Sequence, residues 1–156
     1  HPYTDRDVVH ARESAKIRDI LAEDSEVSGR LHVYSENICE DSTLIQNFNE
    51  SDYLVSDISS VIPDFLFSEK PFAMSVMDRT AEECYEQLPV SRAAHLFGTD
   101  LSSLEASLDA LIGEDLLRQE RIAMKGYYLG EFPEEEYSHV FRNAVINLLD
   151  SAEQNS

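Results

Sequence analysis

The sequence predicts an α/β fold with a Rossmann-like parallel sheet flanked by helices. Short apolar runs rich in β-forming residues alternate, in the first half of the chain, with segments whose apolar residues recur at helical spacing. Such alternation favours parallel strands joined by right-handed helical crossovers. The chain has 156 residues, 42% of them hydrophobic, enough for one domain with a substantial core. We therefore expect a single domain over residues 1–156.

The first half of the chain contains three expected strands separated by helices. In order, we expect a helix at Val8–Leu21, a strand at Leu31–Tyr34, a helix at Thr43–Phe48, a strand at Tyr53–Val55, a helix at Val61–Phe67 and a strand at Phe72–Val76. The second strand is apolar on both sides of its pleat, which is typical of a parallel strand buried by helices on both faces. Pro63 is compatible with the following helix, because first-turn amides have no intrahelical partner.

The pattern changes after Met77. The stretch Tyr85–Phe97 is ambiguous, and we expect a loop with a short strand at Ala94–Phe97. The three segments that follow read as helices, at Leu101–Ile112, Glu114–Lys125 and Glu134–Leu149. The last of these begins with acidic residues, as the helix dipole favours.

The charge of the chain limits its partners. Lys and Arg total 12 and Asp and Glu total 31, which gives a formal charge of -19. Such a surface repels nucleic acid phosphates and anionic lipids, so we expect no nucleic acid partner and no direct membrane contact. An anionic ligand would need a local site. Two cysteines, Cys39 and Cys84, lack metal-type spacing and indicate a reduced, cytoplasmic context.

The segment Asp57–Asp64 is the most informative candidate site. It leaves the second expected strand, and Ser59-Ser60 directly precedes a helix. Ligands of open parallel sheets bind beyond the carboxyl ends of the strands, where helix N-termini offer amides to anions. The turn therefore suits a diphosphate. A serine that only caps the helix would leave the same pattern, and spacing alone does not separate the two.

The flanks of this turn resemble the signature of the CDP-glycerol glycerophosphotransferases, the teichoic-acid-type polymerases and primases. The matching run is SDYLVSDISSVIPDF from Ser51 to Phe65, followed by Lys70-Pro71. Ser56 stands where the family has Thr, and Ile58 where it has Tyr. The opening His1-Pro2 also resembles a His-Pro of the family. The resemblance is specific over about Tyr53–Ala73 and weak beyond Met77.

The resemblance implies the C-terminal, nucleotide-binding half of a GT-B fold. The implied reaction transfers glycerol phosphate from CDP-glycerol, or a similar nucleotide-diphosphate donor, to an acceptor hydroxyl in teichoic-acid-like polymer synthesis. The implied catalytic residue is His1, as a base or phosphate contact. The implied nucleotide- and phosphate-binding residues are Ser59, Ser60, Asp57, Val61, Asp64, Asn37, Ile38 and Arg142. No cofactor is certain, and a divalent metal stays open.

The chain starts at His1 rather than Met, so we expect a fragment that lacks its N-terminal acceptor domain and is inactive alone. The full-length enzyme is expected at the cytoplasmic face of the membrane, attached through the missing part. Two alternatives stay open. One is a GT-B glycosyltransferase domain that uses a UDP-sugar, because one fold serves both donors. The other is a non-catalytic acidic α/β interaction module.

Overall fold

The computed structural model describes residues 8–32 and 43–154. The chain divides into two compact units, His1–Gln46 and Asn47–Ser156, which are described separately. The predicted strand at Leu31–Tyr34 lies partly outside the described residues. Its first two residues, Leu31 and His32, are not in a strand.

The first unit contains one long helix, α1 (Val8–Ser28), which continues past the predicted end at Leu21. It ends where Gly29 adopts a positive φ of 71°, a conformation that costs glycine little. Beyond the helix, the His32 imidazole Nε2 lies 2.6 Å from the Asp24 carboxylate. This contact is the main cause that holds the pKa of Asp24 below its usual value, and a hydrogen bond from Ser28 is the second cause. His32 therefore pairs with a carboxylate of α1 only eight positions earlier in the chain.

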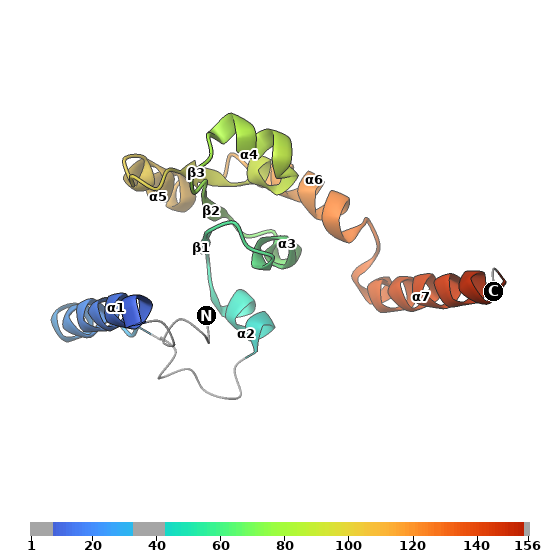
Figure 1. Ribbon diagram of the computed structural model, residues 1–156, viewed down its shortest axis with the longest axis horizontal. Helices are drawn as coiled ribbons and strands as arrows, with labels where there is room; N and C mark the ends of the chain where they lie inside the picture. Colours follow the sequence, from blue (N-terminus) through green and yellow to red (C-terminus); the bar gives the residue numbers. More distant parts are fainter. Residues whose placement is uncertain (1–7, 33–42, 155–156) are drawn as a thin grey trace. The chain divides into compact units, whose positions relative to one another are not determined.

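The second unit is built on a three-stranded parallel sheet with the order β1-β2-β3 (Figure 1). The strands are β1 (Leu54–Ser56), β2 (Phe72–Ser75) and β3 (His95–Phe97). Val55 lies opposite Ala73, and Ala73 lies opposite His95. Because all three strands run in the same direction, their carboxyl ends meet at one edge of the sheet. The α/β prediction is confirmed at this level.

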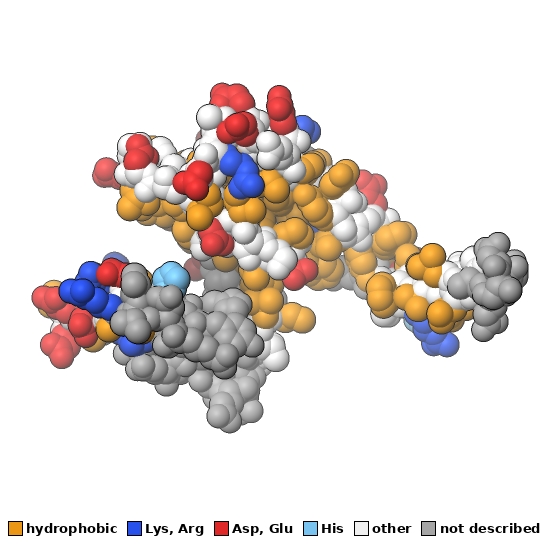
Figure 2. Space-filling model, viewed as in Figure 1, with side chains coloured by type: hydrophobic (Ala, Val, Ile, Leu, Met, Phe, Trp, Pro, Cys, Tyr) orange, Lys and Arg blue, Asp and Glu red, His pale blue; other side chains and the backbone are white. Residues whose placement is uncertain are grey.

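The helices beyond α1 are α2 (Leu44–Glu50), α3 (Val61–Phe65), η2 (Leu66–Ser68), α4 (Ala81–Gln87), η3 (Pro89–Ala93), α5 (Leu104–Ile112), α6 (Arg118–Leu129), η4 (Glu134–Glu136) and α7 (Tyr137–Gln154). Those from α3 to η3 connect the strands, whereas η4 and α7 follow α6 at the end of the chain. α4 begins with a capping box, in which Thr80 and Glu83 each accept the other's backbone N–H. Acidic side chains of this helix gather at the top of Figure 2.

One face of the sheet carries the main core. The buried members of this core are Ile62, Phe65, Leu66, Phe72, Met74, Val90, Ala93 and Ala94. Phe72 and Met74 belong to β2, and Ala94 directly precedes β3. The others come from α3, η2 and η3, the segments that connect successive strands, so both crossovers lie on the same face. Consecutive right-handed crossovers in one direction require this arrangement. α6 packs on the same layer through Met124 and Leu129.

The opposite face is covered by α5. Leu111 and Leu104 of this helix pack against Ala73 of β2 and Phe97 of β3. β2 is consequently buried along its whole length. β1 is not, because the Val55 side chain is 50% exposed. The prediction that β1 is buried on both faces is therefore wrong: among the described residues it is an edge strand that α5 does not cover.

Candidate functional site

The turn between β1 and α3 lies at the carboxyl edge of the sheet, as the sequence predicts. Ser59 organises it. Its hydroxyl accepts the N–H of Val61 at 3.3 Å, and its carbonyl oxygen accepts the N–H of Ile62 at 3.2 Å. Two amides at the start of α3 are thus already engaged by one serine. The turn is a serine-capped helix start, the form expected of short polar side chains that bond to nearby backbone.

The remaining groups of this turn face solvent. Ser60 occupies the N-cap position with a helical backbone, and its side chain makes no capping hydrogen bond. Asp57, Ser60 and Asp64 are exposed. Within the described residues, neither carboxylate has a hydrogen-bond partner. Among the described residues, the Ser60 hydroxyl therefore makes no hydrogen bond, whereas the Ser59 hydroxyl already accepts one from Val61.

The helix behind this turn is short. α3 has five residues and continues as the three-residue η2, in place of the helix predicted at Val61–Phe67. A helix of one turn carries a smaller dipole than the long helices of the usual anion sites. The turn thus offers an anion a free hydroxyl and few free amides, beside two carboxylates.

Lys70, which belongs to the matching run of the resemblance, has a structural role. Its ammonium group donates to the carbonyl oxygens of Phe48 and Asn49, each at 2.8 Å, and of Ser51 at 2.6 Å. These carbonyls lie at the C-terminal end of α2, where the last turn leaves acceptors unsatisfied. Lys70 therefore caps α2 and is not free for a ligand phosphate.

The other predicted site residues are not brought to this turn. His1, Asn37 and Ile38 lie outside the described residues. Arg142 is exposed on α7, and no contact among the described residues joins it to the β1–α3 turn. The predicted site residues that do lie together belong to one short segment, the β1–α3 turn and the start of α3. They are Asp57, Ser59, Ser60, Val61 and Asp64.

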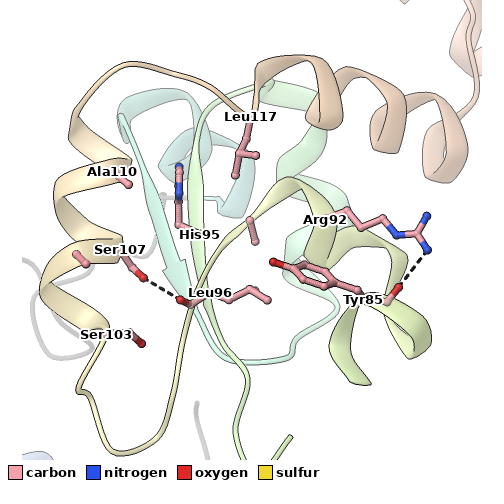
Figure 3. Close-up of a pocket in the computed structure, with 10 residues that line it drawn as sticks. Tyr85, Arg92, His95, Leu96, Ser103, Ser107, Ala110 and Leu117 are labelled. Carbon is pink, nitrogen blue, oxygen red and sulfur yellow. Dashed lines mark hydrogen bonds between the residues drawn. The ribbon is translucent and has the colours of Figure 1, made fainter. Parts of the chain in front are cut away.

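A cavity of about 410 Å³ lies beside β3, away from the β1–α3 turn (Figure 3). Its lining residues come from α4, η3, β3 and α5 and from the positions directly before β3, α5 and α6: Tyr85, Arg92, Ala94, His95, Leu96, Ser103, Ala106, Ser107, Ala110 and Leu117. Most are apolar or small, and none is acidic. Two polar groups are already engaged, since Ser107 donates to the Leu96 carbonyl at 2.8 Å and Arg92 to the Tyr85 carbonyl at 3.2 Å.

A partly buried polar cluster joins α6 to Glu69, which follows η2, and to Asp115, which lies in the segment before α6. The Arg121 side chain is completely buried. Its Nε donates to the Glu69 carbonyl oxygen at 3.0 Å, and its Nη2 donates to the Asp115 carboxylate. The Glu69 carboxylate accepts from Lys125 at 2.9 Å and from Arg118 at 3.4 Å. Three cations of α6 thus hold the segment that enters β2.

The charges of this cluster shift the pKa values of its members. The Lys125 hydrogen bond lowers the pKa of Glu69, and the Arg121 hydrogen bond lowers that of Asp115. Burial, followed by the positive charge of Arg121, lowers the pKa of His95, against a weaker opposite effect of Asp115. His95 is accordingly neutral at neutral pH.

Sequence reasoning assigned no role to His95 and did not single out Arg121. One feature of the sequence does indicate a buried role for Arg121. Leu117, Arg121 and Met124 recur at spacings of four and three residues, so the arginine occupies the apolar stripe of α6. A charged residue at such a position needs a buried partner. The partners, Glu69 and Asp115, do not follow from spacing.

Two further findings concern metal binding and membrane spanning. Among the described residues, no group of three His, Cys, Asp or Glu side chains is arranged to hold a metal ion. Within that same part of the chain, no helix has the length and apolar character needed to cross a bilayer.

Comparisons of the chain with protein-family models, with curated proteins and with solved structures find no match.

Proposed function

We propose that this chain is the donor-nucleotide domain of a CDP-glycerol-type glycerophosphotransferase. The observation that carries the proposal is the SDISSVIPDF run, from Ser56 to Phe65, at the carboxyl edge of a parallel sheet. In this position a nucleotide diphosphate can meet the turn without entering the core. The acceptor hydroxyl would attack the β-phosphorus of the donor, and CMP would leave.

Ser60 has the central role in this proposal. Its hydroxyl is exposed and makes no capping bond, so it can donate to a donor phosphate at no cost to the helix. Ser59 holds the turn in shape, and Val61 and Asp64 follow in the helix. His1 as base, Asn37 and Ile38 at the nucleobase, and Arg142 at the phosphates remain parts of the proposal that rest on the resemblance. Attachment of the whole enzyme to the cytoplasmic membrane face has the same basis.

Calorimetry with CDP-glycerol tests the proposal. Ser60→Ala should weaken binding by roughly 1–3 kcal/mol, the value of a hydrogen bond to a charged group. Ser138→Ala, at an exposed position on α7, serves as the matched control and should leave the affinity unchanged. Equal affinity of the Ser60→Ala variant and the parent chain would refute the role of this turn. Binding of UDP-sugars in place of CDP-glycerol would favour the glycosyltransferase alternative.

A second candidate is a non-catalytic acidic α/β interaction module. The hydrogen bond from the Val61 N–H to the Ser59 hydroxyl favours it, because this serine acts as a helix cap. This candidate predicts no binding of CDP- or UDP-linked compounds. A thermal-shift panel of both donor types separates the two candidates, since only a nucleotide-binding domain gains stability from a ligand.

A further inference from the structure

The cavity beside β3 lies between two helices. Figure 3 shows α5 on one side of it, Tyr85 of α4 on the other, and β3 between them. The wall that α5 provides consists of small side chains, those of Ala106, Ser107 and Ala110. Small side chains leave room in front of the helix. The cavity of about 410 Å³ falls within the range of about 300–1,000 Å³ that is common for small-molecule sites.

The α5 wall is held in place by hydrogen bonds to the strand. The Ser107 hydroxyl donates to the Leu96 carbonyl oxygen of β3 at 2.8 Å. The Ser103 hydroxyl, directly before α5, accepts the N–H of Gly98 at 3.3 Å. Both serines are thus engaged in joining α5 to β3, so the cavity is formed before a ligand enters. A preformed site costs less to order on binding.

Charge restricts the class of ligand that the cavity suits. Among the described residues that line it, Arg92 alone carries a charge at neutral pH, since burial lowers the pKa of His95. The Arg92 side chain extends away from α5 and donates to the Tyr85 carbonyl oxygen at 3.2 Å (Figure 3). A charged ligand would lose its hydration here without gaining an ionic partner. The net charge of -19 disfavours an anion further. The cavity therefore suits an uncharged molecule.

Two polar groups of the lining side chains are not engaged by other described residues. Nε2 of His95 is buried and has no hydrogen-bond partner there, and the Tyr85 hydroxyl makes no hydrogen bond there. The His95 ring points toward the end of the cavity where Ala110 and Leu117 lie, and the Tyr85 ring points toward Leu96 (Figure 3). Because buried polar groups are nearly always paired, an unpaired imidazole nitrogen beside a cavity favours a ligand that can form hydrogen bonds.

We propose that this cavity binds a small uncharged aromatic molecule with a hydroxyl group, a phenol by chemical class. Its ring packs against the small side chains of α5 and the ring of Tyr85. Its hydroxyl group, which can both donate and accept, bonds to the Tyr85 hydroxyl and the His95 imidazole, the two groups without a partner among the described residues. The site is separate from the β1–α3 turn and does not depend on the function proposed for that turn.

Titration of the full chain with phenol, toluene and benzoate, followed by NMR, tests the proposal. Phenol should shift the backbone amide signals of α5 and β3 and the ring proton signals of His95. Toluene, which has a similar shape but no hydroxyl group, should bind about threefold to tenfold more weakly, the effect of one hydrogen bond. Benzoate, which is charged, should bind at least about tenfold more weakly than phenol.

Two variants locate the site. Ala110→Leu places a larger side chain in the cavity and should abolish the shifts that phenol causes. Ala123→Leu, at an exposed position on α6, is the matched control and should bind phenol as the parent chain does. Tyr85→Phe removes one hydroxyl group and should weaken phenol binding about threefold to tenfold.

Any of four results would overturn the proposal. They are the absence of phenol binding, benzoate binding as tight as that of phenol, His95 ring signals that do not move at saturating phenol, and unchanged phenol affinity in Ala110→Leu. The first three are measured on the unaltered chain, so the proposal stays testable if Ala110→Leu folds poorly.

Discussion

The Lys70 ammonium group lies 2.8 Å from the carbonyl oxygen of Phe48, a residue 22 positions earlier in the chain. It reaches two further carbonyls at the end of α2. One side chain thus joins the helix before β1 to the segment that enters β2. Because Lys70 belongs to the run that carries the family resemblance, a stability effect and a binding effect of this residue must be measured separately.

Lys70→Met should lower the free energy of unfolding by about 1–3 kcal/mol, because three carbonyl acceptors lose a charged donor while the apolar stem is kept. Urea denaturation monitored by circular dichroism measures the change. Lys16→Met is the control, since the ion pair of Lys16 with Glu13 is exposed and should contribute less than about 1 kcal/mol. Equal stabilities of the two variants would contradict the capping role.

Asp115→Ala should destabilise the chain by about 3 kcal/mol, because it leaves the buried charge of Arg121 without its carboxylate. This is the lower end of the cost of breaking a buried pair, since the Asp115 side chain is 34% exposed. Arg121→Met should cost less than Asp115→Ala, because it removes the buried charge and keeps an apolar side chain in the same space. Denaturant midpoints of the two variants give the order, and the reverse order would contradict this account.

Acidification should weaken the link between Glu69 and α6. The pKa of Glu69 is lowered in the folded chain, chiefly by the Lys125 hydrogen bond. Its stabilising contribution is therefore present above the ordinary value of 4.5 and is lost as the pH falls through the folded pKa. Urea titrations at a series of pH values should show a shallower decline for Glu69→Gln than for the parent chain. Glu86→Gln, at an exposed position on α4, should leave the slope unchanged.

The two serines of the β1–α3 turn should behave differently. Ser59→Ala should lower stability by about 0.5–1 kcal/mol, because the Val61 N–H loses its acceptor. Ser60→Ala should leave stability nearly unchanged, because its side chain makes no capping bond. Thermal unfolding of both variants measures this difference. A large loss in Ser60→Ala would show that this hydroxyl has a structural role and would remove it as a clean probe of ligand binding.

Gly130 should tolerate no side chain. Its φ is 83°, and a Cβ there would lie 2.3 Å from the Phe132 ring. Gly130→Ala should therefore cost more than the roughly 1 kcal/mol expected of an unfavourable backbone alone. Gly29→Ala is the matched control, because Gly29 also has a positive φ but has open space around it. Similar losses of stability in both variants would show that the Phe132 ring can move aside.

Local sequence signals predicted much of the fold. The apolar runs at β1 and β2 and the amphipathic pattern of α5 were recognised, each within a few residues of its bounds. The stretch Tyr85–Phe97 was the least predictable, since α4 and η3 are both short and share no period. α1 continued past its predicted end because polar residues can extend an exposed helix without any apolar signal.

The sequence by itself determined the fold class and the place of the serine turn, because both depend on residues that are neighbours along the chain. Only the tertiary structure decided which polar groups are already in use. The Ser59 hydroxyl accepts the N–H of Val61 in α3, and the Lys70 ammonium group donates to carbonyl oxygens at the end of α2. Arg121 donates to a carbonyl oxygen 52 residues earlier. Such pairings depend on how the crossovers place helices against the sheet. The spacing of residues along the chain therefore does not predict them.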